Sequence, residues 1–366
     1  MMKILHRLVA VPALLLIVGC SDDLVNRPTV ANGLELRRDH TDGAKGPISA
    51  LSWNIYVGAD VDAVISALVS PDPTDDLPAL LEAIQTLHET DFPARAEAIA
   101  DEIGRRRPHV IGLQEVWNID IDLTALGLPV DVDIDFLPTL ESALAARGLN
   151  YSVAANVQNT DANPLPGLRV IDHDVILIDR ERVTITSSVA QNFAANIGTV
   201  APGVNLIRGW VAVEAMIHGQ SFTIVNTHLE SGAGEALSGL RALQAGELAA
   251  TIARAPRVIL MGDLNDSPGS AMYRVLTAAD FVDVWKALRP RSAGLTCCHA
   301  ADLSNRRAAF TQRIDYVFSR GFDMKKKDVA GRITIVGDQP RDRITHPVHD
   351  IWPSDHAGLA VSLRAP

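Results

Sequence analysis

The chain has 366 residues, of which 47% are hydrophobic and 21% charged, a composition typical of a globular protein with ample material for a core. Its formal net charge is −11 at pH 7, which argues against tight, non-specific binding of nucleic acid. Proteins of that kind usually present a basic surface that releases counterions from phosphates. The overall charge does not exclude a local basic cleft.

Residues 1–19 are predicted to be a signal peptide. Lys3 and Arg7 give a positively charged start, residues 8–18 form an apolar run broken by one proline, and a glycine follows. The apolar run is too short to span a bilayer. The sequence therefore favours export from the cytoplasm.

The segment "LIVGC", which ends at Cys20, resembles the bacterial lipobox, in which the cysteine becomes the lipidated first residue. The alternative is an ordinary signal peptide with an incidental cysteine. We favour an extracytoplasmic lipoprotein held at the membrane through Cys20. Residues 20–46 lack apolar periodicity and are predicted to be a flexible tether. Residues 47–366 then form the folded domain.

Within that domain, short apolar segments are interleaved with amphipathic ones, and there is no internal repeat. Segments that are apolar or alternate in polarity predict strands. These lie at 48–53, 109–117, 151–156, 173–180, 209–217, 221–229, 258–261, 312–320 and 332–336. Segments with apolar residues three or four apart predict helices at 77–87, 93–106, 141–147, 235–252 and 269–277.

Three segments leave alternatives open. Residues 119–136 alternate Asp with apolar residues, which is typical either of an exposed hairpin or of a loop near a site. The apolar stretch 54–69 is either an ordinary core helix or a surface that meets lipid. Adjacent Cys297 and Cys298, in the loop 294–305, lack metal-ligand spacing and form either a vicinal disulfide or two buried thiols. The pair implies no catalytic role.

Polar side chains recur where the predicted strands end. Each alone is typical of a turn, but together they include the residue types that hold a hard metal ion and move a proton. The set comprises Asn54, Glu115, His228, Asp263, Asn265, Asp315, Asp355 and His356. Turn chemistry alone does not produce such a set, so we predict a catalytic site.

Six short motifs carry a family resemblance. They are, in chain order, "LSWNI", "VIGLQEVW", "VNTHLES", "MGDLND", "RIDYVF" and "PSDHAGL". Their order resembles that of the endonuclease/exonuclease/phosphatase superfamily, which includes deoxyribonucleases, neutral sphingomyelinases and inositol-polyphosphate 5-phosphatases. The resemblance implies an α/β (α+β) fold, a four-layer sandwich of two mostly antiparallel sheets flanked by helices.

The resemblance also implies a metal site. Glu115 matches the metal-binding glutamate of the family, with Asn54 beside it, and Asp355 is a third candidate ligand. Carboxylate and amide oxygens suit Mg²⁺ or Mn²⁺, which keep water and substrate phosphate oxygens as further ligands.

The remaining residues match roles in water attack on a phosphoester. His356 matches the general base, and Asp315 matches the carboxylate that orients its ring. Asp263 matches the residue that positions the attacking water. Asn265 matches a residue that hydrogen-bonds the scissile phosphate or reaches the metal. His228 matches a donor to a phosphate oxygen, which offsets the negative charge that develops in the transition state.

The predicted activity is metal-dependent hydrolysis of a phosphodiester or phosphomonoester. A membrane tether and an acidic chain favour a phospholipid or sphingomyelin-type substrate. An extracytoplasmic nuclease is the first alternative. Such an enzyme would need a groove lined by Lys and Arg, and the only dense basic runs in the sequence are 105–107 and 325–327. The second alternative is a binding module without activity, against which the intact set of site residues argues.

Overall fold

The computed structural model describes residues 46–70, 72, 74–324 and 331–364. The predicted signal peptide, Cys20, nearly all of the tether and the basic run 325–327 lie outside the described residues. Among the residues described, no helix is long and apolar enough to cross a membrane.

The first sheet pairs strands from both ends of the domain. Within the described residues, its strands follow the order β15-β16-β1-β2-β6-β5-β9-β8, and β3 joins β4 to β6. Their bounds are β1 (Ile48–Asn54), β2 (Val110–Gln114), β3 (Asn118–Asp122), β4 (Asp131–Asp135), β5 (Tyr151–Ala162), β6 (Leu168–Asp179), β8 (Gly198–Ala201), β9 (Val204–Leu206), β15 (Gly331–Val336) and β16 (Gly358–Leu363). Most neighbours are antiparallel, but β1 and β2 are parallel.

The second sheet has the order β13-β14-β12-β11-β10-β7. Its strands are β7 (Val183–Asn192), β10 (Gly209–Ile217), β11 (Gln220–His228), β12 (Val258–Asp263), β13 (Val282–Asp283) and β14 (Asp315–Arg320). Only β11 and β12 are parallel within the described ladders of this sheet. Apolar side chains from both sheets, such as Val213, Ile259 and Val361, fill the space between them.

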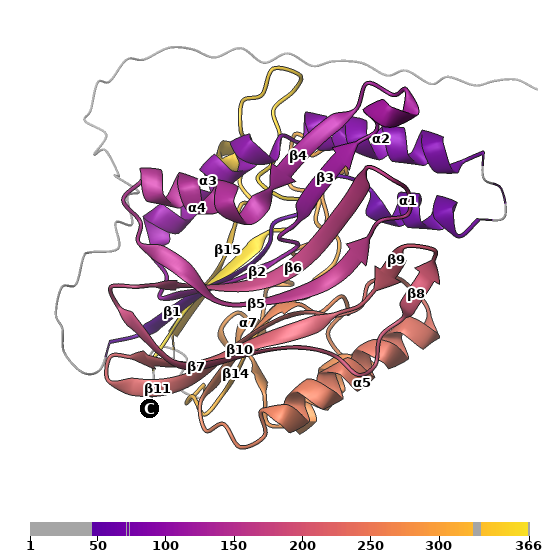
Figure 1. Cartoon of the computed structure of the whole chain (residues 1–366). Coiled ribbons are helices and arrows are strands. Elements are labelled where there is room, and N and C mark those ends of the chain that lie inside the picture. Colours follow the sequence, from indigo (N-terminus) through magenta and orange to yellow (C-terminus); the bar gives the residue numbers. More distant parts are fainter. Residues whose placement is uncertain (1–45, 71, 73, 325–330, 365–366) are drawn as a thin grey trace, which may run out of the picture. The chain divides into compact units, whose positions relative to one another are not determined.

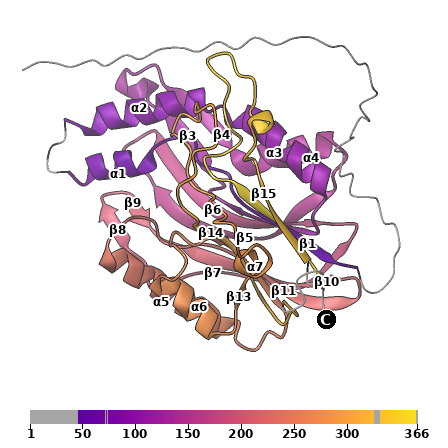
Figure 2. The same ribbon diagram turned by 180° about the vertical axis from the view of Figure 1, so that it is seen from behind.

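Helices cover the outer faces of both sheets, which gives four layers (Figure 1; Figure 2 shows the reverse side). The helices are α1 (Val61–Leu68), α2 (Asp76–Glu89), α3 (Phe92–Arg106), α4 (Phe136–Ala146), α5 (Glu235–Thr251), α6 (Ala271–Ala278) and α7 (Val284–Leu288), with 3₁₀ turns η1 (Thr124–Leu126) and η2 (Pro340–Asp342). The helices α2, α3 and α4 pack on the first sheet, while α5 and α6 pack on the second. The predicted four-layer sandwich is confirmed.

The structure decides between the alternatives for residues 119–136 and corrects two strand predictions. The 119–136 segment is a hairpin of β3 and β4, whose apolar Ile119, Ile121 and Val132 are buried while most of its Asp residues face solvent. The apolar stretch 54–69 contains α1. The strand predicted from 312 begins at Asp315, and β7 was missed because nearly all of its residues are exposed, so it lacks an apolar alternation.

A buried polar link joins the two sheets beneath their polar edge. Gln114 Nε2 donates to Asn226 Oδ1 at 2.5 Å, and Asn226 Nδ2 donates to the carbonyls of Leu113 and Val175 at 2.8 and 3.1 Å. Gly112 makes room for this link, since a Cβ there would lie 2.7 Å from Asn226 Oδ1. The facing strands are thereby held in register just below the candidate site.

Candidate active site

Strand pairing brings the predicted polar residues to one edge of the sandwich. In the second sheet, His228 of β11 pairs with Asp263 of β12, and Asp263 pairs with Asp315 of β14. In the first sheet, Asn54 of β1 lies beside the end of β2, where Glu115 follows. Parallel neighbours end at the same edge of a sheet, so the side chains that follow them meet there.

The backbone at this edge is bent to aim the side chains. Tyr56, Glu115 and Asn265 have φ values of 59°, 58° and 51°, in the left-handed region that non-glycine residues rarely adopt. Such conformations persist only where the surroundings enforce them, and they cluster at functional sites. Leu264 turns into the core, which leaves its neighbours Asp263 and Asn265 at the site.

His356 lies between two aspartates. Its Nδ1 is 2.9 Å from Asp315 Oδ2, and its Nε2 is 3.7 Å from Asp263 Oδ2. All three side chains are buried. Because a carboxylate only accepts hydrogen bonds, Nδ1 carries a proton toward Asp315 and Nε2 faces the site. This is the arrangement expected of an oriented general base.

Burial and charge perturb this group strongly. Burial raises the pKa of Asp263 to about 7, and the nearby charge of Asp315 adds to the effect. Burial by itself lowers the pKa of His356, but the carboxylates of Asp315, Asp355 and Asp263 outweigh it and raise that pKa well above its ordinary value. The site therefore contains more negative charge than its imidazole alone balances.

Oxygen donors gather beside the histidine. Asn54 Nδ2 donates to Glu115 Oε1 at 2.8 Å and to Asp263 Oδ2 at 3.1 Å, so it bridges the two sheets. Val57 N donates to Glu115 Oε2 at 2.8 Å. Burial raises the pKa of Asp355 to about 7, and Glu115 is close enough to raise it further.

These donors fit a hard divalent cation. Across the described part of the chain, no Lys or Arg forms an ion pair with Glu115, Asp263 or Asp355 within 4.0 Å. One oxygen of Asp315, Oδ1, is also buried without a hydrogen-bond partner there. Crowded carboxylates that lack a Lys or Arg salt bridge suit a Mg²⁺ or Mn²⁺ site. Asp263, Asp315 and His356 have ligand atoms within 4.8 Å of one another. Glu115 and Asp355 stay the carboxylate ligands predicted from the sequence.

His228 lies on the other side of Asp263. Its Nε2 is 3.5 Å from Asp263 Oδ2 and 2.8 Å from Asn265 Nδ2, and its Nδ1 is 3.1 Å from a guanidinium nitrogen of Arg208. Burial and the Arg208 charge lower the pKa of His228 well below its ordinary value. A guanidinium and an amide NH₂ both only donate, so Arg208 and Asn265 each present a donor to a ring that accepts at one nitrogen when it is neutral. With Nδ1 accepting from Arg208, the ring proton sits on Nε2, and the ring would donate toward a phosphate oxygen once the Asn265 amide turns away from it.

Arg208 was missed from the sequence and is held by acidic side chains behind His228. Its guanidinium lies 3.4 Å from Asp172 Oδ2 and 3.6 Å from Glu230 Oε1. Asp174 Oδ2 accepts a hydrogen bond from the His228 backbone at 3.0 Å. This buried ionic group fixes the position of the His228 ring.

Arg95 was also missed. It is buried, and its guanidinium donates to the carbonyls of Ile55 at 2.6 Å, Tyr56 at 3.0 Å and Pro353 at 3.2 Å. Burial lowers its pKa to about 10, so it stays charged at neutral pH. Arg95 therefore ties the loop after β1 to the segment that precedes His356.

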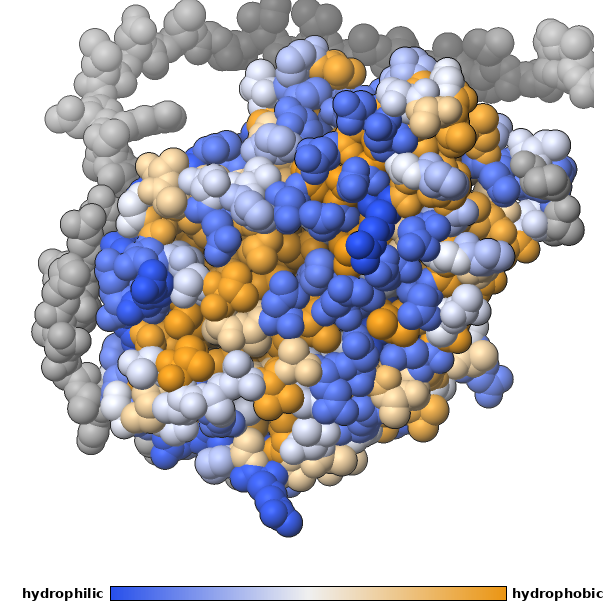
Figure 3. All heavy atoms as spheres, in the orientation of Figure 1, coloured by the Kyte–Doolittle hydropathy of each residue, from blue (hydrophilic) through white to orange (hydrophobic). Residues whose placement is uncertain are grey.

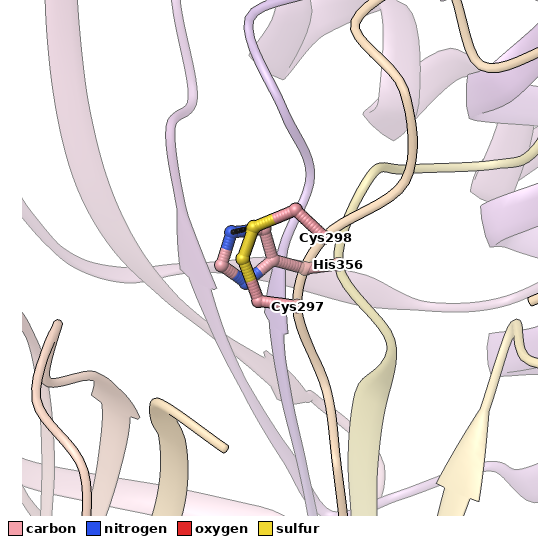
Figure 4. A group of neighbouring side chains, drawn as sticks. All are labelled: Cys297, Cys298 and His356. Carbon is pink, nitrogen blue, oxygen red and sulfur yellow. Dashed lines mark hydrogen bonds between the residues drawn. A yellow bond between two sulfur atoms is a disulfide. The ribbon is translucent and has the colours of Figure 1, made fainter. Parts of the chain in front are cut away.

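The cysteine pair lies at the site, where the sequence suggested no role for it. Cys297 and Cys298 form a disulfide, and Cys298 Sγ is 3.8 Å from His356 Nε2 (Figure 4). The loop 294–305 also supports the site through Thr296, whose hydroxyl accepts from the Asp315 backbone at 3.3 Å. Nothing in the local sequence indicated these contacts.

Comparison with known proteins agrees with this geometry. The endonuclease/exonuclease/phosphatase family matches the chain over residues 51–356, from the first motif to His356. The chain belongs to this family. Members of the endonuclease/exonuclease/phosphatase family are generally hydrolases that act on phosphoester bonds, and they typically use divalent metals such as Mg²⁺. No curated protein matches the chain.

Solved structures share the fold at low sequence identity. A family protein from Bacteroides thetaiotaomicron has 16% identity and a TM-score of 0.56, covering 88% of this chain and 96% of its own. Truncated Caenorhabditis elegans TDP2 has 18% identity and a TM-score of 0.52, and the match covers 87% of this chain and 98% of the TDP2 chain. Danio rerio TDP2 in complex with a single-strand DNA product has 18% identity and a TM-score of 0.50, and the match covers 86% of this chain and 98% of the TDP2 chain.

Proposed function

We propose that this member of the endonuclease/exonuclease/phosphatase family hydrolyses a phosphodiester carried by a lipid-like amphiphile. The reaction is direct attack by a water molecule that His356 activates. The observation that carries the hydrolytic part is the placement of His356 Nε2 opposite Asp263, with Asp315 bound to the other ring nitrogen. The non-catalytic binding module has no such observation in its favour.

The residues divide the work between them. Asp263 accepts a hydrogen bond from the attacking water, and His356 Nε2 takes the proton that this water loses. Asp315 holds the ring and stabilises its charged form. The Nε2 proton of His228 and the amide of Asn265 donate to the phosphate oxygens as negative charge develops.

The oxygen donors beside His356 would form the cation site. Glu115 and Asp355 would hold Mg²⁺ or Mn²⁺, with Asn54 bridging Glu115 to Asp263. When bound, the cation supplies positive charge that polarises a phosphate oxygen and offsets the carboxylates around His356.

An apolar pocket of about 370 Å³ next to the oxygen donors supports the lipid-like substrate. It lies between α1, α2, β3 and the 160–170 segment, and almost all of its lining residues are apolar. Val57 connects pocket and site, since its side chain lines the pocket while its N–H donates to Glu115. A phosphodiester at Glu115 would thus lie within reach of a space suited to hydrocarbon.

The surface beside the pocket also carries exposed apolar side chains. Val69, Leu77 and Leu81, at the end of α1 and on α2, are 53%, 45% and 36% exposed. Figure 3 shows apolar surface among polar residues on the face that Figure 1 presents. Exposed apolar side chains next to an apolar pocket suit contact with a lipid aggregate.

A nucleic-acid substrate has weaker support. The DNA product named for Danio rerio TDP2 belongs to that protein, and the similarity here extends to the fold. In this chain Arg105 and Arg106 both pair with Glu102, so their charges are partly neutralised. A DNA-binding groove would need free basic side chains along it.

To test this proposal, the full-length chain in detergent is assayed with four substrates: sphingomyelin, bis-p-nitrophenyl phosphate, plasmid DNA and a phosphomonoester. Each is assayed with Mg²⁺, Mn²⁺ or EDTA. We expect EDTA-sensitive hydrolysis of sphingomyelin and of the small diester. Cleavage of DNA alone would favour the nuclease, and no turnover with no bound metal would favour the binding module.

A substitution that fills the apolar pocket tests the lipid-like substrate separately from the hydrolysis itself. Ala83, on α2, lines the pocket, so Ala83→Trp is expected to lower kcat/KM for sphingomyelin by roughly tenfold while sparing bis-p-nitrophenyl phosphate. Glu82→Trp, at an exposed neighbour on the same helix, is the matched control. Equal losses on both substrates would show that the pocket does not hold the chain of the lipid.

We further propose that a lipid on Cys20 keeps the domain at the membrane, where amphiphilic substrates lie. Cys20→Ser is expected to move the protein from the membrane fraction to the soluble fraction of the expressing cells. Fractionation followed by immunoblotting measures the shift. Membrane association that survives the substitution would contradict the anchor.

A further inference from the structure

Three possible ligand atoms meet at the face of His356 that the mechanism uses. The Sγ atoms of Cys297 and Cys298 and a ring nitrogen of His356 all lie within 4.8 Å of one another. Cys298 Sγ is 3.8 Å from His356 Nε2 (Figure 4). Cys297 is buried, whereas Cys298 is partly exposed.

Main-chain hydrogen bonds fix the cysteines in this place. Cys297 N donates to the Gln312 carbonyl at 3.1 Å, and Gln312 N donates back to the Cys297 carbonyl at 2.9 Å. On the other side, Ala357 N donates to the Thr296 carbonyl at 2.8 Å. None of these bonds involves sulfur. The hydrogen bonds that hold the cysteine backbone beside His356 therefore do not depend on the S–S bond.

The reduced pair would have a chemistry unlike that of the oxygen-rich site. Two thiolates and one imidazole nitrogen are the donors that Zn²⁺ prefers, whereas Mg²⁺ prefers oxygen. Tetrahedral zinc with thiolate and imidazole ligands places neighbouring donor atoms roughly 3.5 to 4 Å apart. The Cys298–His356 separation of 3.8 Å falls in that range. Asp263 Oδ2, 3.7 Å from the same nitrogen, offers a fourth donor.

We propose that reduced Cys297 and Cys298 form, with His356 Nε2, an inhibitory site for Zn²⁺ or another thiophilic divalent cation. A thiol or phosphine reductant supplies two electrons, the S–S bond breaks, and two protons complete the thiols. Binding of the cation then displaces both thiol protons. The cation occupies the nitrogen that otherwise takes the proton from water. This inhibition rests on the proposed hydrolysis, whereas the binding does not.

Binding is tested without any assay of activity, with Co²⁺ as a spectroscopic probe. The full-length chain is prepared oxidised and phosphine-reduced, with excess Mg²⁺ to fill the oxygen site. Thiolate-to-cobalt absorption is expected in the reduced protein and not in the oxidised one. Cys298→Ser is expected to weaken Co²⁺ binding by at least roughly tenfold, since even changes beyond the ligands cost that much.

Inhibition is tested on the same preparations, with Zn²⁺ added to the hydrolysis assay. Zn²⁺ is expected to inhibit the reduced protein and to leave the oxidised protein and reduced Cys298→Ser active. The proposal is overturned if reduced wild type lacks the thiolate absorption or if Cys298→Ser binds Co²⁺ as tightly. Equal inhibition of oxidised and reduced protein would overturn the inhibitory role. Thiolate absorption without hydrolysis of any substrate would instead count against the proposed function.

Discussion

Replacing His356 by alanine is expected to lower kcat by roughly 10²–10⁴-fold, the usual contribution of a positioned general acid–base group. The ring is the only imidazole among the described residues that lies within 4.0 Å of both Asp315 and Asp263. Its loss leaves Asp263 able to bind water but without a group to take the proton. The measurement is steady-state hydrolysis of bis-p-nitrophenyl phosphate at saturating Mg²⁺.

The fold is expected to survive this change. The contacts that hold the segment use the main chain and its neighbours: Trp53 Nε1 donates to the His356 carbonyl at 3.0 Å, and His356 N donates to Ser354 Oγ at 3.1 Å. Thermal melting should confirm this. His88→Ala, at an exposed site on α2, is the matched control and should keep full activity. Turnover of His356→Ala near that of the control would place the base elsewhere.

The strand-end residues of the site could be predicted because local sequence and strand direction determine them together. A buried strand followed by a polar residue is visible in the chain, as at Asn54, His228 and Asp263. Parallel pairing of β1 with β2 and of β11 with β12 then carries these ends to one edge. The motif order indicated which strands share that edge.

The supporting residues could not be predicted, because their partners are distant in sequence. Arg95 lies four residues before Ile99, on the same face of α3, so the pattern places it toward the core. The sequence pattern does not show that the guanidinium donates hydrogen bonds to the carbonyls of Ile55 and Pro353. Arg208 is similar, since its acidic partners come from β6 and from the loop after β11.

The cysteine pair illustrates the same limit. Adjacent cysteines carry no metal-ligand spacing, so the local pattern indicated no site. Their relation to His356 depends on the isolated bridges that Cys297 forms with Gln312 on one side and with His356 on the other. Such long-range pairing is a property of the fold.

Replacing Glu115 by glutamine is expected to raise the Mg²⁺ concentration needed for half-maximal activity by roughly 10–100-fold, comparable to the cost of disturbing metal-ligand surroundings. Both Glu115 oxygens accept hydrogen bonds, from Asn54 Nδ2 and from Val57 N. Glutamine offers one acceptor, so its amide group would face one of these donors. The substitution therefore removes a charge and breaks the hydrogen bond from either Asn54 or Val57.

Titration of activity with Mg²⁺ measures this effect, and thermal melting provides a second readout. A ligand that binds the folded state raises the melting temperature, so Mg²⁺ should stabilise wild type more than Glu115→Gln. Glu82→Gln, exposed on α2, controls for the loss of a negative charge. If saturating Mg²⁺ restores kcat, Glu115 acts mainly by holding the cation. If kcat stays low at saturation, the link from Glu115 through Asn54 to Asp263 also positions the attacking water. An unchanged Mg²⁺ requirement would mean that the cation is held by other residues.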